Sequence, residues 1–167
     1  TEKILFNTRR LSELVGNVLI ISKLESGAVD VNKEDFRLDE QIRQSIMLLE
    51  PKWVEKDIEF DIELDEIVYH GDKTLLLHVW NNIIGNAIKF SPFAGLITIR
   101  LESSGDEIIF YVDDCGAGIE ESAKKHIFDK FYQADSSHKQ EGNGLGLALV
   151  KRIVDMFEGT ITAENLP

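Results

Sequence analysis

Hydrophobic positions near the start of the chain recur at intervals of three and four residues, which predicts a long helix over residues 4–24. The apolar side chains on its a and d positions are Ile4, Leu11, Leu14, Val18 and Ile21. This pattern is typical of a helix in a bundle or coiled coil, because it places one apolar stripe along the helix. Gly27, shortly after the stripe, is a typical helix stop. The helix needs partner helices to bury its stripe.

The remaining chain mixes strand-like and helical patterns. Residues 58–64 alternate strictly between apolar and acidic side chains, which predicts a half-buried strand. Further strands are predicted over residues 67–69, 96–103, 107–114 and 160–163, with a hairpin turn at Ser104-Gly105. Further helices are predicted over residues 39–53, 73–89, 121–127 and 145–157, with Asp39 as a cap and a kink at Pro51. This order predicts an α+β sandwich with helices on one face of a mixed sheet.

Composition limits the classes of partner. The chain has 167 residues, of which 43% are hydrophobic, so it can bury the core of one domain. Its formal net charge of −12 disfavours nucleic acid, which is bound by clustered Lys and Arg. Residues 130–152 are net positive, so an anionic ligand remains possible there. The single cysteine, Cys115, excludes an intrachain disulfide. The chain does not begin with Met, so we expect it to be a fragment.

One helix carries polar residues on a single face. In "NNIIGNAIKFSP", Asn82, Asn86 and Lys89 are spaced by four and three residues, which aligns them along one side of a helix. The amide oxygen of Asn86 could bind Mg²⁺, which prefers hard oxygen ligands, and Lys89 could reach a phosphate. An exposed helix edge would also explain the pattern.

A glycine-rich turn follows the last predicted hairpin strand. In "VDDCGAGI", Asp114 stands where the apolar alternation stops, so we expect its carboxylate at the end of the sheet rather than in open solvent. Gly116 and Gly118 allow another group to approach closely. An ordinary turn after a strand would also explain this motif.

A second glycine run precedes a helix directly. In "QEGNGLGLALVKRIV", Gly142, Gly144 and Gly146 lie at alternate positions. Backbone N–H groups freed by glycine, together with the start of a helix, form a site that suits phosphate. The chain has no P-loop motif, and a dinucleotide fingerprint is excluded because the run follows a polar loop rather than a strand. A flexible loop is the alternative.

The order and spacing of these motifs resemble those of a known family. The Asn-rich helix, the DxGxG turn, the pair Phe128 and Phe131, and the GxGLGL run are similar to the N, G1, F and G2 boxes of histidine kinases. The resemblance covers residues 32–163 and implies the Bergerat (GHKL) ATP-binding fold, a two-layer α/β sandwich. Residues 28–167 would then form the catalytic domain. The coiled-coil-like helix of residues 1–27 resembles the second helix of that family's dimerisation domain.

The resemblance implies ATP and Mg²⁺ as cofactors and assigns roles to individual residues. Asn86 would bind the metal, while Asn82 and Lys89 would line the phosphate region as catalytic residues. Asp114 would accept a hydrogen bond from the adenine amino group. The further nucleotide contacts that the resemblance implies fall on Gly116, Gly118, Lys130, Gly142, Gly144, Leu145 and Gly146. The last glycines would belong to a mobile ATP lid, and we expect residues 133–143 to be poorly ordered without nucleotide, because they are polar and lack periodicity.

The resemblance also implies a reaction type. Hydrolysing relatives have a glutamate near the position of Asn82, and an amide cannot act as a general base, so phosphoryl transfer to histidine is expected rather than hydrolysis. The histidines of the chain are His70, His78, His126 and His138. None of them lies in an H-[ED]-x-x-[TN]-P setting. We therefore expect the acceptor to precede Thr1 and the chain alone not to phosphorylate itself.

The expected partners follow from the same resemblance. They are ATP, the receiver domain of a response regulator, and a second copy of the full-length parent bound through the N-terminal helix. The chain would be the cytoplasmic domain of a membrane-bound sensor. Two alternatives remain open: a hydrolytic ATPase of the same fold, and a nucleotide-binding module that changes conformation without transferring phosphate.

Overall fold

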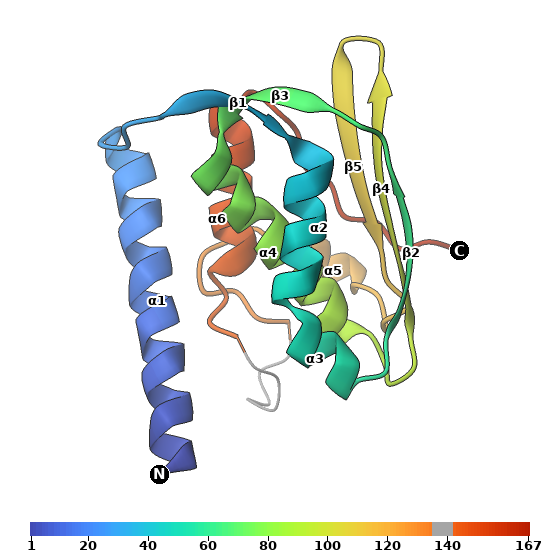
Figure 1. The fold of residues 1–167 in the computed structure, drawn as a ribbon. Coiled ribbons are helices and arrows are strands. Elements are labelled where there is room, and N and C mark those ends of the chain that lie inside the picture. Colours follow the sequence, from blue (N-terminus) through green and yellow to red (C-terminus); the bar gives the residue numbers. More distant parts are fainter. Residues whose placement is uncertain (135–141) are drawn as a thin grey trace. The chain divides into compact units, whose positions relative to one another are not determined.

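The structure is a computed structural model that describes residues 1–134 and 142–167 (Figure 1). It divides into two compact units. We call Val31–Gly118 the sheet unit, and Thr1–Asp30 together with Ile119–Pro167 the helical unit. Among the described helices, none combines the length and the apolar character needed to cross a membrane.

The sheet unit contains all the strands of the described chain. They are β1 (Lys33–Arg37), β2 (Glu59–Leu64), β3 (Val68–Asp72), β4 (Leu96–Ser104) and β5 (Glu107–Asp113). β2 runs parallel to β4, and β4 pairs antiparallel with β5, so the sheet β2-β4-β5 is mixed. β1 and β3 form a separate antiparallel pair. The α+β class with a mixed sheet is therefore confirmed, although β2 and β3, which are consecutive in sequence, belong to different sheets.

Three helices of the sheet unit pack with its strands: α2 (Leu38–Leu48), α3 (Glu50–Glu55) and α4 (Lys73–Phe90) (Figure 1). The strand residues Ile97, Ile99 and Leu101 are buried, because strict alternation puts them on one face of β4. On the same face, Phe60 meets Trp53 of α3, and Phe110 meets Trp80 of α4, both edge to face. The helices thus cover one face of the sheet, as predicted.

A buried amide joins α2 to α4. The indole N–H of Trp80 donates to Oε1 of Gln41 at 2.8 Å, and Nε2 of Gln41 donates to the carbonyl of Lys73 at 2.7 Å. Gln41 is only 3% exposed, so both hydrogen bonds replace water that the core excludes. The pair of bonds fixes α2 against the first part of α4.

The predicted cap of the second helix is wrong. α2 begins directly after β1, with Arg37 in the cap position, and Asp39 lies in the first turn. The Arg37 guanidinium donates to both carboxylate oxygens of Asp39, at 2.8 and 2.7 Å. This hydrogen bonding lowers the pKa of Asp39, although burial of the carboxylate acts in the opposite direction. Asp39 therefore supports the helix through the dipole and an ion pair rather than as a cap.

Other boundaries differ for local reasons. The sequence did not predict β1, because only Phe36 of its five residues is buried and no alternation results. The structure has no single kinked helix at Pro51. Instead, α2 ends at Leu48, and the separate helix α3 begins at Glu50. The hairpin turn lies at Gly105-Asp106, one residue later than predicted, and Gly105 adopts a φ of 62°.

The helical unit contains α1 (Glu2–Ser26), α5 (Glu121–Lys124) and α6 (Gly146–Met156). α1 ends as predicted at Gly27, whose φ of 69° is left-handed and whose N–H bonds back into the last turn. α1 packs along α6, and Ile21 is the one α1 residue that is buried. Most of the predicted apolar stripe of α1 is exposed.

The predicted final strand, residues 160–163, is wrong. These residues have no regular secondary structure, because no neighbouring strand forms a hydrogen-bonded ladder with them. Ile161 and Ala163 are still half-buried in alternation, which is the pattern that suggested a strand. Instead, the side chain of Asn165 holds this segment by hydrogen bonds to the backbone N–H and carbonyl of Ile119, both at 2.8 Å.

Burial of His78 on α4 predicts a pH dependence of stability. Burial lowers the pKa of this imidazole below its ordinary value of 6.5, so the unfolded chain takes up a proton more readily than the folded one. The stability that the neutral ring contributes is present above that ordinary value and is lost as the pH falls through it. We expect His78→Gln to flatten the decline in unfolding free energy between about pH 7.5 and pH 5. Urea unfolding of both proteins across this range measures the decline, and equal slopes would contradict the assignment.

Candidate functional site

The helix α4 carries the first group of expected site residues. Asn82, Asn86 and Lys89 all lie within its unbroken length and are half-buried, so their spacing places them along one helix face. At the N-terminus of α4, Oδ1 of Asp72 accepts from the backbone N–H of Leu75 at 3.0 Å. The helix is therefore capped at its start.

Asn82 has a fixed amide. Its Nδ2 donates to the carbonyl of His78, one turn earlier, at 2.7 Å. This bond occupies a donor and leaves Oδ1 as the acceptor of the side chain. Lys89 lies near the end of the helix, with its ammonium 4.7 Å from the ring centroid of Phe90. The face thus combines amide oxygens with a positive charge.

The C-terminal end of α4 is held by a residue that the sequence did not indicate. The ammonium of Lys56 donates to the carbonyls of Ile88, Lys89 and Ser91, at 2.9, 2.6 and 2.8 Å. These contacts span more than thirty positions of sequence. No local motif could have pointed to Lys56, because the contact forms only when the chain folds.

The turn after β5 carries the second group. Asp114 follows the last residue of β5, as predicted, but it is exposed, which corrects the expectation that it lies out of open solvent. Its Oδ1 accepts from the backbone N–H of Gly116 at 2.8 Å, a hydrogen bond that closes a local turn. A Cβ atom on Gly116 would lie 2.8 Å from the carbonyl oxygen of Phe90, so glycine lets the turn lie directly against the end of α4. Gly118 has a φ of 77°.

The sheet unit therefore brings the two groups together. Asn82, Asn86 and Lys89 lie on the helix that ends at Phe90, and the Asp114 turn touches that end. A negative acceptor, amide oxygens and an ammonium are the groups that a base, a metal and a phosphate would need. The described residues contain no cluster of three His, Cys, Asp or Glu side chains that could hold a metal alone. A Mg²⁺ bound at Asn86 would need oxygens from a ligand.

The glycine run belongs to the helical unit. Leu145 is almost fully buried and stands at the cap position of α6, whose first residue is Gly146. Gly144 has a φ of 71°, and a Cβ atom there would lie 2.6 Å from the carbonyl carbon of Phe131. Glycine is thus required at this position by backbone contact as well as by conformation. Gly142, with a φ of 146°, accepts from the side chain of Gln133 at 2.8 Å.

Lys130 is paired in this structure. Its ammonium forms an ion pair with Glu25 at the end of α1, and Arg152 of α6 lies 3.9 Å from the same carboxylate. The hydrogen bond from Lys130 lowers the pKa of Glu25. Binding of a phosphate by Lys130 would therefore compete with this ion pair. Residues 135–141, which make up most of the segment expected to be poorly ordered without nucleotide, lie outside the described residues.

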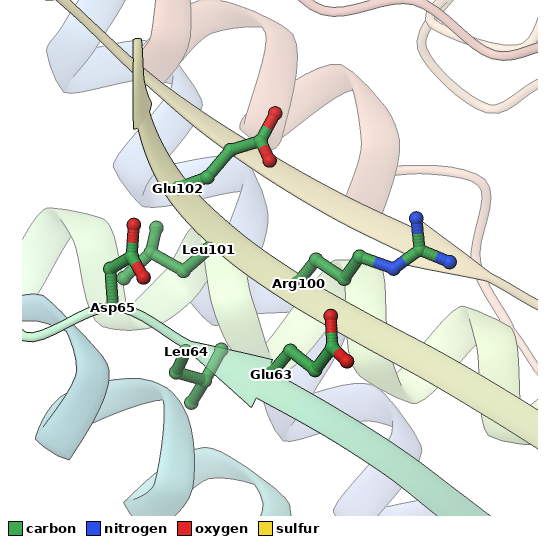
Figure 2. A pocket seen from close by; sticks show the side chains of 6 residues that line it. All are labelled: Glu63, Leu64, Asp65, Arg100, Leu101 and Glu102. Carbon is green, nitrogen blue, oxygen red and sulfur yellow. The ribbon is translucent and has the colours of Figure 1, made fainter.

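A pocket of about 420 Å³ lies elsewhere, where the end of β2 meets the middle of β4 (Figure 2). Its lining residues are Glu63, Leu64, Asp65, Arg100, Leu101 and Glu102. None of them belongs to the expected nucleotide site, and the strand pairing alone places Glu63 opposite Arg100. We therefore do not assign the expected chemistry to this pocket.

Comparison with known protein families explains the arrangement around α4. The model of the histidine kinase-, DNA gyrase B- and HSP90-like ATPases matches residues 71–167, which include α4, the Asp114 turn and the glycine run. The chain belongs to this ATPase family. The match confirms the ATP-binding domain that the resemblance of the four motifs implied.

Individual proteins to which the chain is similar indicate the same family. The chain is 35% identical over 155 residues to the heme sensor protein HssS of Staphylococcus epidermidis, covering 93% of the chain and 34% of HssS. Full-length ShkA, solved in complex with AMPPNP, is 28% identical with a TM-score of 0.77 over 92% of the chain and 34% of ShkA. ThkA, solved with the response regulator protein TrrA, is 26% identical with a TM-score of 0.71 over 95% of the chain and 45% of ThkA. The chain thus spans about a third of the length of HssS.

In this ATPase domain, the close contact between Gly116 and the end of α4 predicts that a larger residue at position 116 lowers the stability of the fold. In Gly116→Ala, the new Cβ would meet the carbonyl oxygen of Phe90 and Oδ1 of Asp114, both at 2.8 Å. Backbone has to move to relieve the first contact, so we expect a loss of about 1–3 kcal/mol of unfolding free energy.

Gly85→Ala, within α4, is the matched control. A Cβ on Gly85 would have no neighbour within 4 Å, and alanine favours a helix over glycine by about 1 kcal/mol. We expect this variant to gain stability while Gly116→Ala loses it. Denaturant unfolding compares the two, and equal or reversed shifts would exclude the close approach at Gly116.

Proposed function

We propose that the chain is the ATP-binding catalytic part of a sensor histidine kinase, which transfers the γ-phosphoryl group of ATP to a histidine for relay to a response regulator. The observation that carries this proposal is the face of α4 with Asn82, Asn86 and Lys89, whose end lies against the Asp114 turn. The relatives support it, since ShkA was solved with AMPPNP and ThkA with a response regulator.

Each expected residue takes a role that its chemistry allows. Asp114 accepts from the adenine amino group, and Gly116 and Gly118 keep the base pocket open. Mg²⁺ takes oxygen ligands, often one or two from protein with the rest from phosphates and water, so the amide oxygen of Asn86 suits it. The metal would neutralise charge on the transferring phosphates. The phosphate contacts proposed for the helical unit fall on Lys130, Gly142, Gly144, Leu145 and Gly146.

Transfer is favoured over hydrolysis by the chemistry of Asn82. A hydrolytic ATPase needs a group that orients or deprotonates water, and an amide has no useful basicity. One amide donor of Asn82 is also used by the carbonyl of His78. Catalysis by positioning and charge neutralisation remains available, and it is sufficient for phosphoryl transfer.

The long helix supports a role in assembly. We assign residues 1–27 to the second helix of a dimerisation domain and residues 28–167 to the catalytic domain. The exposed apolar residues of this helix are Ile4, Leu5, Phe6, Leu11, Val15, Val18 and Leu19. Such a surface suits a helical bundle with a second copy of the parent protein. The parent would be a membrane-bound sensor with this part in the cytoplasm.

A reconstitution with a separate acceptor distinguishes the candidate functions. The chain is mixed with Mg-ATP and a histidine kinase dimerisation fragment that contains an H-E-x-x-T-P motif. A kinase domain gives acid-labile, base-stable phosphate on the fragment and none on the chain itself. Rapid phosphate release without labelling would indicate a hydrolytic ATPase. ATP binding with neither product would indicate a nucleotide-binding module.

Replacement of the proposed metal ligand should separate binding from folding. We expect Asn86→Ala to abolish the Mg²⁺-dependent part of ATP affinity and to leave the helix intact, because alanine has a higher helix propensity than asparagine. Calorimetric titrations with Mg²⁺ and with EDTA, beside thermal unfolding, measure both properties. Mg-ATP affinity equal to that of the unmutated chain would remove Asn86 from the metal site.

Hydrogen-bond polarity predicts the choice of base. A carboxylate at Asp114 only accepts hydrogen bonds, so it suits the amino group of adenine and opposes the carbonyl oxygen of guanine. Asp114 is exposed in this structure, but a base bound against it would cover the carboxylate. An unpaired polar group covered in this way costs about 1–3 kcal/mol, which corresponds to a preference for ATP over GTP of roughly ten- to a hundredfold.

Asp114→Asn should narrow this preference. The amide can keep its oxygen on the N–H of Gly116, where Oδ1 now accepts at 2.8 Å, and offer its NH₂ group to guanine. Competition of ATP and GTP at fixed Mg²⁺ gives the ratio for both proteins. Equal affinities in the unmutated chain would show that Asp114 does not select the base.

A further inference from the structure

Lys56, between α3 and β2, makes an unusual number of contacts for a surface lysine. It is half-buried, and its ammonium donates to three main-chain carbonyls, those of Ile88, Lys89 and Ser91. An ammonium has three donors, so all of them are used. The carbonyls belong to the last turn of α4 and its cap, where no helical N–H is available and the helix dipole is negative. Lys56 therefore caps the C-terminal end of α4, although it lies more than thirty residues away in the sequence.

The main chain around Lys56 holds the loop that follows α4. The carbonyl of Lys56 accepts from the N–H of Ala94 at 2.8 Å, and the N–H of Glu59 donates to the carbonyl of Gly95 at 2.9 Å. Ala94 has a φ of 54°, a conformation that a non-glycine residue adopts only when its surroundings enforce it. The segment from residue 88 to residue 95 is thus bound to residues 56–59 along its length.

The same segment also touches the Asp114 turn. A Cβ atom on Gly95 would lie 2.9 Å from Sγ of Cys115, and one on Gly116 would lie 2.8 Å from the carbonyl oxygen of Phe90. The end of α4 and the loop after it therefore contact both Lys56 and the turn that presents Asp114. Movement of this end would shift Lys89 and Asp114 together.

We propose that Lys56 is a positioning residue for the nucleotide site. It contacts neither base nor phosphate itself. By fixing the last turn of α4, it sets the place of Lys89 and provides the surface against which the Asp114 turn is held. The inference rests on the proposed roles of Lys89 and Asp114 in ATP binding, and it adds a third, distant residue on which both depend.

The test compares variants at the two ends of the same helix. Lys56→Met keeps an unbranched stem of similar volume and removes the ammonium, so three carbonyls lose their donor. Asp72→Ala removes the cap at the start of α4, where Oδ1 accepts from Leu75 and Oδ2 from the N–H of Asn32. Both variants weaken the helix, but only the first loosens the end beside Asp114. ATP and GTP affinities are measured by titration at a temperature where circular dichroism shows each protein folded.

We expect Lys56→Met to lose about tenfold in ATP affinity, which is the lower end of the loss seen when an outer-shell partner of a metal ligand is removed. The ratio of ATP to GTP affinity should also fall, because Asp114 is less well held. Lys56→Arg should recover part of both, since it restores a charged donor, although a planar fork cannot converge on three carbonyls in the same way. Asp72→Ala should lower the melting temperature and leave the ratio unchanged.

Each outcome separates this inference from the function on which it rests. An unmutated chain that does not bind ATP would overturn the proposed function. A chain that binds ATP, with a Lys56→Met variant of equal affinity and base preference, would overturn the role of Lys56 alone. Equal changes of the ratio in Lys56→Met and Asp72→Ala would show a loss of stability rather than of positioning. Should Lys56→Met be unfolded at the measuring temperature, Lys56→Gln, which keeps an amide donor, takes its place in the same comparison.

Discussion

The backbone groups at the two ends of α4 have no partners within the helix, and the rest of the sheet unit depends on how they are satisfied. At the start, the carboxylate of Asp72 is buried and accepts from two main-chain N–H groups, those of Leu75 and Asn32. At the end, the ammonium of Lys56 satisfies three carbonyls. A charge of the sign that complements the helix dipole thus stands at each end. The helix is fixed in place by residues that are not part of it.

This fixed helix explains how residues from distant parts of the sequence form one candidate site. Asn82, Asn86 and Lys89 need only the helical period to share a face. Asp114 needs the end of α4 as a support, because its own turn is short, exposed and closed by one hydrogen bond to Gly116. The two glycines that permit close approach, Gly95 and Gly116, lie on opposite sides of that contact. Base selection and phosphate binding would therefore depend on the same helix end.

Periodic patterns made much of this arrangement predictable from the sequence. The helix of residues 73–89 and the first hairpin strand, β4, were predicted because each buries one continuous face, which imposes a period on its apolar residues. β1 buries only Phe36, and it pairs with β3 through the backbone, so it left no pattern. Polar contacts between residues far apart in the chain leave no periodic pattern in the sequence either. Neither the three carbonyls around Lys56 nor the ion pair between Lys130 and Glu25 follows from local spacing.

The chemistry proposed for this domain fits the way its polar groups are used. A site that activates water needs a free basic group, whereas Asn82 offers an amide with one donor already bound to the carbonyl of His78. What remains is an acceptor oxygen held in one orientation and a second N–H donor, and these serve placement rather than proton transfer. Phosphoryl transfer asks for alignment and charge neutralisation, both of which are lost when a site is loose. A helix capped at both ends by buried or half-buried charges supplies that rigidity without placing a base near the phosphate.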